Sequence, residues 1–121
     1  MKLHLDRGPG QNVFTGYGDG YVSINNQRYE HSVLLAPGRE VLKWDASFDE
    51  LTRADFEALL EFQPEVIVFG TGEKLRFPQP HLTHGLHARS VGVEVMDTKA
   101  ACRTYNILVA EGRQVVAAVL L

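Results

Sequence analysis

The sequence predicts an α/β layered domain whose sheet is largely buried and at least partly parallel, with a β-meander at its N-terminal end. Three observations predict it. In the C-terminal two thirds, helical patterns alternate with short apolar runs, which is typical of strand–helix–strand units. The run Val66–Phe69 is apolar throughout and lies between a proline and a glycine pair, the pattern of a strand covered on both faces. The first third has short segments rich in Tyr, Val and Ile, divided by turn residues.

Length and composition are those of one ordinary domain, which we expect to cover residues 1–121. Of the 121 residues, 45% are hydrophobic and 22% are charged, and single cores of roughly 100–150 residues are the commonest size. The 12 basic and 15 acidic side chains give a net charge of −3 without a run of like charges, which argues against nucleic-acid binding. No apolar run approaches the ~18 residues that span a bilayer, so membrane insertion is not expected.

The cytoplasm is the expected location. The start of the chain, MKLHLDRGPGQN, lacks the apolar stretch of a secretory signal and the Arg/Ser-rich character of a transit peptide. The single cysteine cannot form an internal disulfide, which fits a reducing compartment.

In the first third, turn residues delimit four short β segments. A Gly-Asp-Gly string at 18–20 separates the first two, and an Asn-Asn pair at 25–26 follows the second. Asn tolerates positive φ, so the Asn pair predicts a tight hairpin turn. A Pro-Gly pair at 37–38 ends the third segment, and Glu40–Trp44 is a candidate fourth strand.

The middle of the chain predicts a helix that begins after Thr52. Thr52 is a good N-cap, and Asp55 stands three residues later in a variant of the capping box. Leu51 and Phe56 occupy the two positions of a hydrophobic staple. Pro64 ends this helix.

Two further helices are expected. A weaker pattern follows Pro80 over His81–Ala88. Asp97 can cap the third helix of the chain, and Gly112 ends that helix in the C′ position.

Three apolar segments are expected to be strands of one sheet: Val66–Phe69, Val91–Val95 and Val115–Leu120. A helical crossover is available between the first two, and parallel pairing requires such a crossover, so we expect these two to be parallel. The direction of the last strand is left open.

The glycine turn directly after the first buried strand is a candidate site, because ligands in open α/β sheets bind beyond the carboxyl ends of strands. Backbone N–H groups at Gly70 and Gly72 can approach an anion closely. The simpler interpretation is a tight turn that needs flexible φ. A dinucleotide fingerprint would need a glycine where Leu75 stands, and a P-loop would need Gly-Lys-Ser/Thr, so neither kind of nucleotide site is expected.

Three histidines recur at His81, His84 and His87, and three imidazoles can hold zinc. On a helix, however, His81 and His87 diverge by roughly 120°. Gly85 also weakens the helix, and converging partners for a metal site are not evident. No structural metal is expected.

The third helix carries polar groups on its inward face. Cys102 is interpreted as a packing residue, although a place near a helix N-terminus could lower its pKa and make it reactive. An inward Asn106 must find hydrogen-bond partners or cost about 1–3 kcal/mol, and it serves either a neighbouring loop or a ligand. Arg113 forks onto an anion or pairs with carbonyls at the helix end, and the second is the simpler interpretation.

Crossover geometry predicts where these groups meet. The glycine turn and the cap at Asp97–Thr98 leave neighbouring parallel strands at one sheet edge, so we expect them side by side. Asn106 is expected beneath this edge, bonded to a backbone loop.

The strings VIVFGTG and VEVMDTKAACRTYNILVAEGRQVVAAVL, with YVSINNQRYEHSVLL near the start, resemble a family of small proteins of undefined biochemistry. The family includes bacterial and archaeal proteins, the mitochondrial complex I assembly factor three and the adipogenesis-associated domain proteins of animals. The resemblance covers nearly the whole chain and implies a three-layer α/β fold on a mixed central sheet, with no established catalysis, cofactor or substrate. Its mitochondrial member suggests the assembly of a respiratory complex. The positions that match the family motif are Gly70, Thr71, Gly72, Met96, Asp97, Thr98, Ala101, Cys102, Thr104, Tyr105, Asn106 and Arg113.

Two functions remain open. The first is a non-catalytic binding or assembly module, whose glycine turn and helix start form a site for a protein partner or a small anionic ligand. The second is a small enzyme acting on an anionic metabolite, with Cys102 or Asp97 reactive. A nucleophile needs an adjacent base, and none is identifiable, which favours the first. No catalytic residue, cofactor or metal is assigned, and the binding candidates are Gly70, Thr71, Gly72, Asp97, Thr98, Cys102, Tyr105, Asn106 and Arg113.

Overall fold

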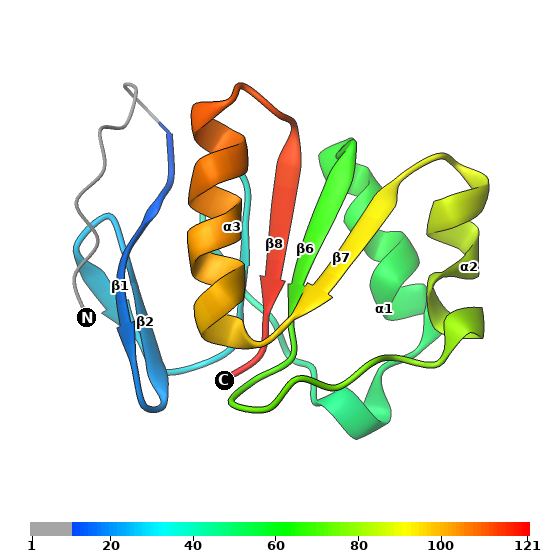
Figure 1. The fold of residues 1–121 in the computed structure, drawn as a ribbon, viewed down its shortest axis with the longest axis horizontal. Coiled ribbons are helices and arrows are strands. Elements are labelled where there is room, and N and C mark those ends of the chain that lie inside the picture. Colours follow the sequence, from blue (N-terminus) through cyan, green and yellow to red (C-terminus); the bar gives the residue numbers. More distant parts are fainter. Residues whose placement is uncertain (1–10) are drawn as a thin grey trace.

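A five-stranded mixed sheet forms the centre of the computed structural model, which describes residues 11–121 (Figure 1). Its strands follow the order β5 (Leu42–Lys43), β4 (Val33–Leu35), β8 (Val115–Val119), β6 (Val66–Gly70) and β7 (Gly92–Met96). β6 pairs in parallel with both β7 and β8, whereas β4 is antiparallel to β5 and β8. The predicted parallel pair is therefore confirmed, and the last strand, whose direction was open, runs parallel to β6.

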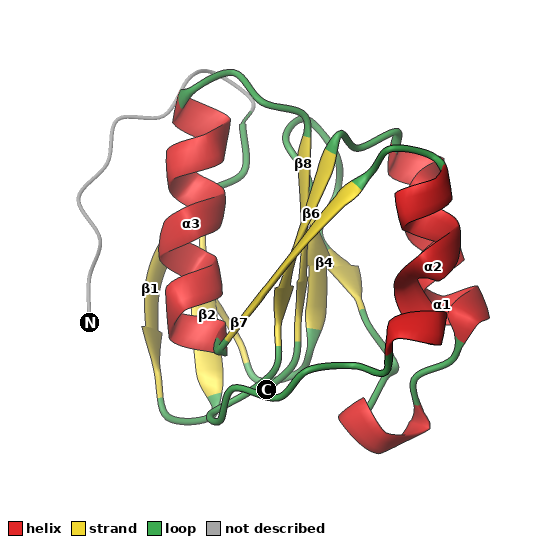
Figure 2. Cartoon of the chain, turned by 45° about the vertical axis from the view of Figure 1, so that its right-hand side comes forward, coloured by secondary structure: helices red, strands yellow, loops and turns green. Residues whose placement is uncertain are grey.

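Helices cover both faces of this sheet, as expected for three layers (Figures 1 and 2). α3 (Thr98–Ala110) covers one face, while α1 (Arg53–Glu57) and α2 (Pro80–Ala88) lie on the other. Side chains alternate along a strand, so β6 contributes to two separate cores. Val66 and Val68 pack with α3, and Ile67 and Phe69 pack with α1 and α2.

The N-terminal meander flanks the central sheet as a sheet of its own. β1 (Phe14–Gly18), β2 (Tyr21–Ile24) and β3 (Gln27–Tyr29) form this small sheet, which packs against α3. The predicted turn at 25–26 is confirmed, because both asparagines have positive φ, 52° and 68°, as a two-residue hairpin turn requires. The third predicted segment divides into β3 and β4, and the candidate strand at 40–44 shortens to the two residues of β5.

The middle helix begins as predicted but ends differently. Thr52 Oγ1 accepts a bond from Asp55 N–H (3.3 Å), and Thr52 N–H donates to Asp55 Oδ2 (2.9 Å), which completes the capping box. The α-helix stops at Glu57, and the chain continues as a 3₁₀ turn over residues 58–62. A proline disfavours the α conformation at the residue before it. Gln63, which precedes Pro64, has a φ of 53°, and the turns before such an end commonly tighten to 3₁₀ form.

The other predicted helices agree closely with the structure. α2 begins one residue before the expected start, with Pro80 in its first turn. α3 is capped by Asp97, whose side chain accepts a bond from Ala100 N–H (2.9 Å). Gly112 follows α3 with a φ of 78°, as a C′ residue does.

Gly70 allows α3 to lie close to β6. A Cβ at this position would come within 3.0 Å of the Ala101 Cβ and 3.2 Å of the Thr98 Cα. Gly92 on the next strand has more room, since the nearest atom to its added Cβ is 3.8 Å away on Val66.

We therefore expect Gly70→Ala to destabilise the protein and Gly92→Ala to be tolerated. Overpacking in a rigid core costs about 1–3 kcal/mol, whereas Gly92→Ala should stay within about 0.5 kcal/mol. Urea unfolding followed by circular dichroism measures both. Equal losses for the two variants would show that the approach of α3 to β6 is not constrained at Gly70.

Candidate functional site

The glycine turn and the start of α3 lie side by side, as predicted. Gly72 N–H donates to Thr98 Oγ1 (2.9 Å), and Thr98 N–H donates to Gly72 O (2.9 Å). The buried Thr98 hydroxyl also donates to Leu120 O (2.6 Å). One side chain thus joins the chain segments that follow β6, β7 and β8.

The glycine turn is held from within. Thr71 is buried, and its hydroxyl donates to Lys74 O (2.6 Å) and accepts from Arg76 N–H (3.1 Å). The Arg76 guanidinium donates to Thr71 O (2.9 Å) and stacks over the Phe48 ring. Because the N–H group of Gly72 is already bonded to Thr98, this turn offers fewer free donors to an anion than the sequence pattern alone indicates.

A cavity of about 540 Å³ opens beside this corner. We call it the corner cleft; its lining includes the β1–β2 turn at 18–20, residues 72–73, residues 97–99 and the C-terminal pair at 120–121. Among the described residues, three acidic residues line it: Asp19, Glu73 and Asp97. Its basic side chain, Lys99, already pairs with Asp19 at 3.6 Å. The excess of carboxylates favours a cationic group or an amide in the cleft over a free anion.

The cleft contains residues that the sequence patterns did not indicate. Glu73 and Lys99 directly follow the two predicted motifs, so adjacency could have suggested them. Asp19 could not be found this way, because it reaches the cleft only through the packing of the small sheet against α3.

Cys102, Tyr105 and Asn106 do not line the corner cleft. They are buried in the core between α3, the central sheet and the small sheet. Burial raises the pKa of the Cys102 thiol to about 12, and the neighbouring Arg103 charge offsets this only in part. Burial likewise raises the pKa of Tyr105.

Asn106 binds the backbone of the small sheet. Its Oδ1 accepts from Phe14 N–H (2.9 Å), and its Nδ2 donates to Phe14 O (2.8 Å). Tyr105 Oη donates to Asn12 O (3.0 Å), and its ring packs edge-to-face on Phe14. The expected location beneath the glycine turn is therefore wrong for Asn106, because its side of α3 faces β1.

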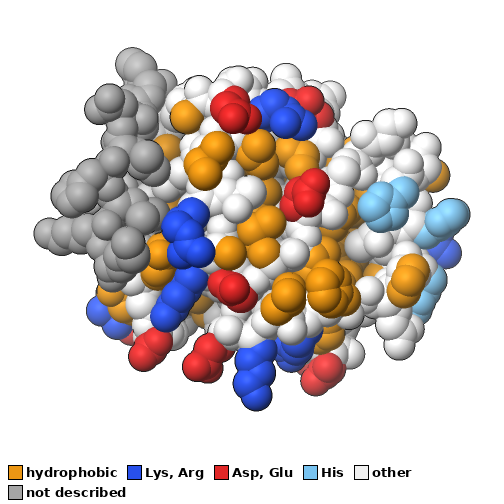
Figure 3. Space-filling view, in the orientation of Figure 1, with side chains coloured by type: hydrophobic (Ala, Val, Ile, Leu, Met, Phe, Trp, Pro, Cys, Tyr) orange, Lys and Arg blue, Asp and Glu red, His pale blue; other side chains and the backbone are white. Residues whose placement is uncertain are grey.

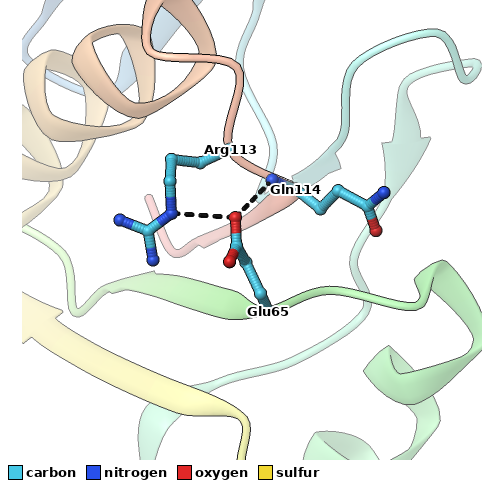
Figure 4. A network of polar contacts seen from close by, with 3 residues as sticks. All are labelled: Glu65, Arg113 and Gln114. Carbon is cyan, nitrogen blue, oxygen red and sulfur yellow. Dashed lines mark hydrogen bonds and ion pairs between the residues drawn. The ribbon is translucent and has the colours of Figure 1, made fainter.

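Arg113 forms a third, separate group (Figure 4). Its Nε donates to Glu65 Oε1 (2.8 Å), and Gln114 N–H donates to the same oxygen (3.0 Å). The hydrogen bond from Arg113 is the main reason that the Glu65 pKa lies below its usual value. Glu65 and Gln114 precede β6 and β8, so this contact lies at the opposite end of the strands from the corner cleft.

The histidines of α2 are exposed at positions 81, 84 and 87. Within residues 11–121, no three His, Cys, Asp or Glu side chains are grouped to hold a metal ion.

We expect Asn106→Ala to lower the free energy of unfolding by about 1–3 kcal/mol, because both backbone groups of Phe14 lose their partner. Asn106→Leu should do no better, since it keeps the volume but not the hydrogen bonds. Ile107→Ala is the matched control on the same helix, because Ile107 is exposed. Chemical denaturation of the three variants decides: a loss for Asn106→Ala no greater than for Ile107→Ala would contradict this role.

Cys102 should react slowly with iodoacetamide at pH 7, because the thiolate is the reactive species. Its thiol stays protonated in the folded chain up to about pH 12, whereas an ordinary thiol loses its proton near pH 9.0. The unfolded chain then binds fewer protons, so stability should fall as pH rises from 9 towards 12, by up to about 1.4 kcal/mol per pH unit from this group. Cys102→Ala should remove that contribution. Rapid labelling of Cys102 in the folded chain at pH 6 would contradict its interpretation as a buried, unreactive thiol.

Comparison with known proteins agrees with this architecture. A protein from Bordetella parapertussis, solved by crystallography, is 40% identical with a TM-score of 0.88, and the match covers 94% of this chain and 98% of that one. The 13 kDa major membrane protein of Francisella tularensis is 29% identical over 95% of both chains. In residues 11–121 of the present chain, no helix has the length and apolar character needed to cross a membrane.

A longer relative carries a functional name. NADH dehydrogenase (ubiquinone) 1 alpha subcomplex assembly factor 3 of Bos taurus is 34% identical over 111 residues, which are 86% of this chain. The match spans 60% of that relative's length. The family described as "Protein of unknown function (DUF498/DUF598)" matches residues 14–120. The chain belongs to this family of proteins of unknown function.

Proposed function

We propose that the protein is a non-catalytic module that binds another protein at the corner cleft and thereby serves in the assembly of a complex. The corner cleft carries this proposal. It lies where three strand ends and the start of α3 meet, and the bonds of Thr98 hold its wall in place. A preformed wall of this kind suits binding, because little chain entropy is lost when a partner docks.

The chemistry of the cleft supports a protein partner with a basic or amide side chain. Asp19, Glu73 and Asp97 supply carboxylates, while Lys99 is held by Asp19. A small anionic ligand is the alternative occupant, and Lys99 would be its main attraction.

The alternative of a small enzyme has less support. Cys102 is buried with a raised pKa, and Asp97 accepts a hydrogen bond from Ala100 N–H as the cap of α3. Catalysis by either would need an accessible nucleophile with an adjacent base.

The relatives add to the case for assembly. The Bos taurus relative is named as an assembly factor, although this chain spans only part of its length. We also propose that the protein lies in the cytoplasm. Its single cysteine, Cys102, is free and buried, which agrees with a reducing compartment.

Charge reversal at the cleft tests this proposal. The tagged full chain is purified from its source cells as wild type, Glu73→Lys and Glu111→Lys. Both glutamates are exposed, but Glu111 lies beyond the far end of α3. We expect Glu73→Lys to reduce recovery of at least one partner about tenfold, which corresponds to about 1.4 kcal/mol, while Glu111→Lys retains it.

Two outcomes would contradict the proposal. The first is identical partner recovery from all three proteins. The second is a rise in melting temperature of the purified wild-type chain with a small anionic metabolite, abolished by Lys99→Glu, since a ligand at 100 times its dissociation constant adds about 2.7 kcal/mol of stability. That result would assign the cleft to the metabolite.

A further inference from the structure

β7 is one of the two edge strands of the central sheet. β7 pairs only with β6 among the strands of residues 11–121 (Figures 1 and 2). Gly92 N–H donates to Glu65 O (3.1 Å), and Met96 O accepts from Thr71 N–H (2.9 Å), so these two residues turn their bonded groups towards β6. Successive residues of a strand point their backbone groups to opposite sides. The N–H and C=O groups of Val93 and Val95 therefore point away from the sheet, along its free edge.

The two edges of this sheet differ. At the other edge, β5 has only two residues and carries Lys43, and both short length and lysine are common protections against strand pairing. β7 has five residues, of which Val93 and Val95 are half-buried against the α1 and α2 core. Its one charged residue is Glu94, which is exposed on the α3 face and has no ion-pair partner within the described residues.

Apolar side chains continue beyond the end of β7. The segment from the glycine turn to α2 runs past this end (Figures 1 and 2). It exposes 52% of Leu75 and 71% of Phe77. Hydrophobic side chains also gather over the lower end of β7 in the space-filling view (Figure 3).

We propose that the β7 edge binds an extended segment of a partner protein, which adds a sixth strand to the central sheet. Val93 and Val95 supply the backbone bonds, as in other cases of strand addition. The added strand carries apolar residues on the face of Val93 and Val95, and a Lys or Arg across from Glu94. A second copy of this chain centred on Glu94 fits less well, because it would place two carboxylates opposite each other.

This surface is separate from the corner cleft and does not depend on it. Its residues lie on the outer edge of β7 and none of them lines the cleft. A charge reversal in the cleft should therefore leave the β7 edge unchanged.

Capped peptides test the proposal by nuclear magnetic resonance on the ¹⁵N-labelled full chain. The probe is TVTVKVTVT, whose lysine lies on the opposite face from its valines, and its partner is TVTVEVTVT. At millimolar lysine peptide, we expect the amide signals of Val93 and Val95 to shift and their hydrogen exchange to slow. Opposite charges across strands favour pairing and like charges oppose it, so the lysine peptide should bind at least about fivefold more tightly.

Variants of the protein test the role of the Glu94 charge, and a modified peptide tests the role of backbone hydrogen bonds. Glu94→Lys should reverse the preference between the two peptides, while Glu111→Lys and the cleft variant Glu73→Lys should keep it. N-methylation of the lysine peptide at alternate residues removes its donors and should abolish binding without any change to the protein.

Three results would overturn the proposal. One is the absence of shifts at Val93 and Val95 with every peptide. Another is a peptide preference that Glu94→Lys leaves unchanged. The third is slow exchange at both valines without peptide in a chain that sediments as a dimer, which would make a second copy the occupant.

Discussion

The buried hydroxyl of Thr98 is the contact on which the arrangement of the central sheet and α3 depends. It accepts from Gly72 N–H and donates to Leu120 O, so it joins the segments after β6 and β8 at the residue that begins α3. Two backbone bonds, from Leu120 N–H to Gly70 O and from Thr71 N–H to Met96 O, complete the corner. A buried hydroxyl that both donates and accepts a hydrogen bond stabilises the fold and also fixes the positions of the strand ends. A displaced strand end would leave polar groups unpaired.

The polar groups of α3 hold the small sheet. A short sheet needs a hydrophobic face or packing against a helix to be stable, and β1 has an irregular register between Phe14 and Gly16. The Asn106 side chain forms hydrogen bonds to both the N–H and the C=O group of Phe14. Tyr105 donates a hydrogen bond to Asn12 O, and its ring packs on the Phe14 ring. α3 thus packs against both sheets, and the buried Asn106 amide bonds to the side of β1 that pairs with no other strand within residues 11–121.

Because these polar groups of α3 are buried, the candidate binding surfaces lie elsewhere, on the outside of the molecule. Cys102 and Asn106 were candidates for a reactive or ligand-binding role in the sequence. In the structure, Cys102 packs in the core and Asn106 bonds to the backbone of Phe14. The two surfaces that we propose for partners are the corner cleft and the β7 edge, where carboxylates, open backbone groups and exposed apolar side chains occur. In both proposed surfaces these groups are of the kind that contact another protein.

Local patterns in the sequence determined most of the elements. The capping box at Thr52, the cap at Asp97 and the asparagine turn at 25–26 depend on contacts within a few residues, so their positions could be predicted. The parallel pair β6 and β7 followed from the crossover between them. Only the tertiary structure decided the partner of Asn106, the separation of Arg113 from the other candidates and the place of Asp19 in the cleft. Each of these joins residues that are far apart in the chain, and a helical pattern shows that a face is inward without showing which sheet that face meets.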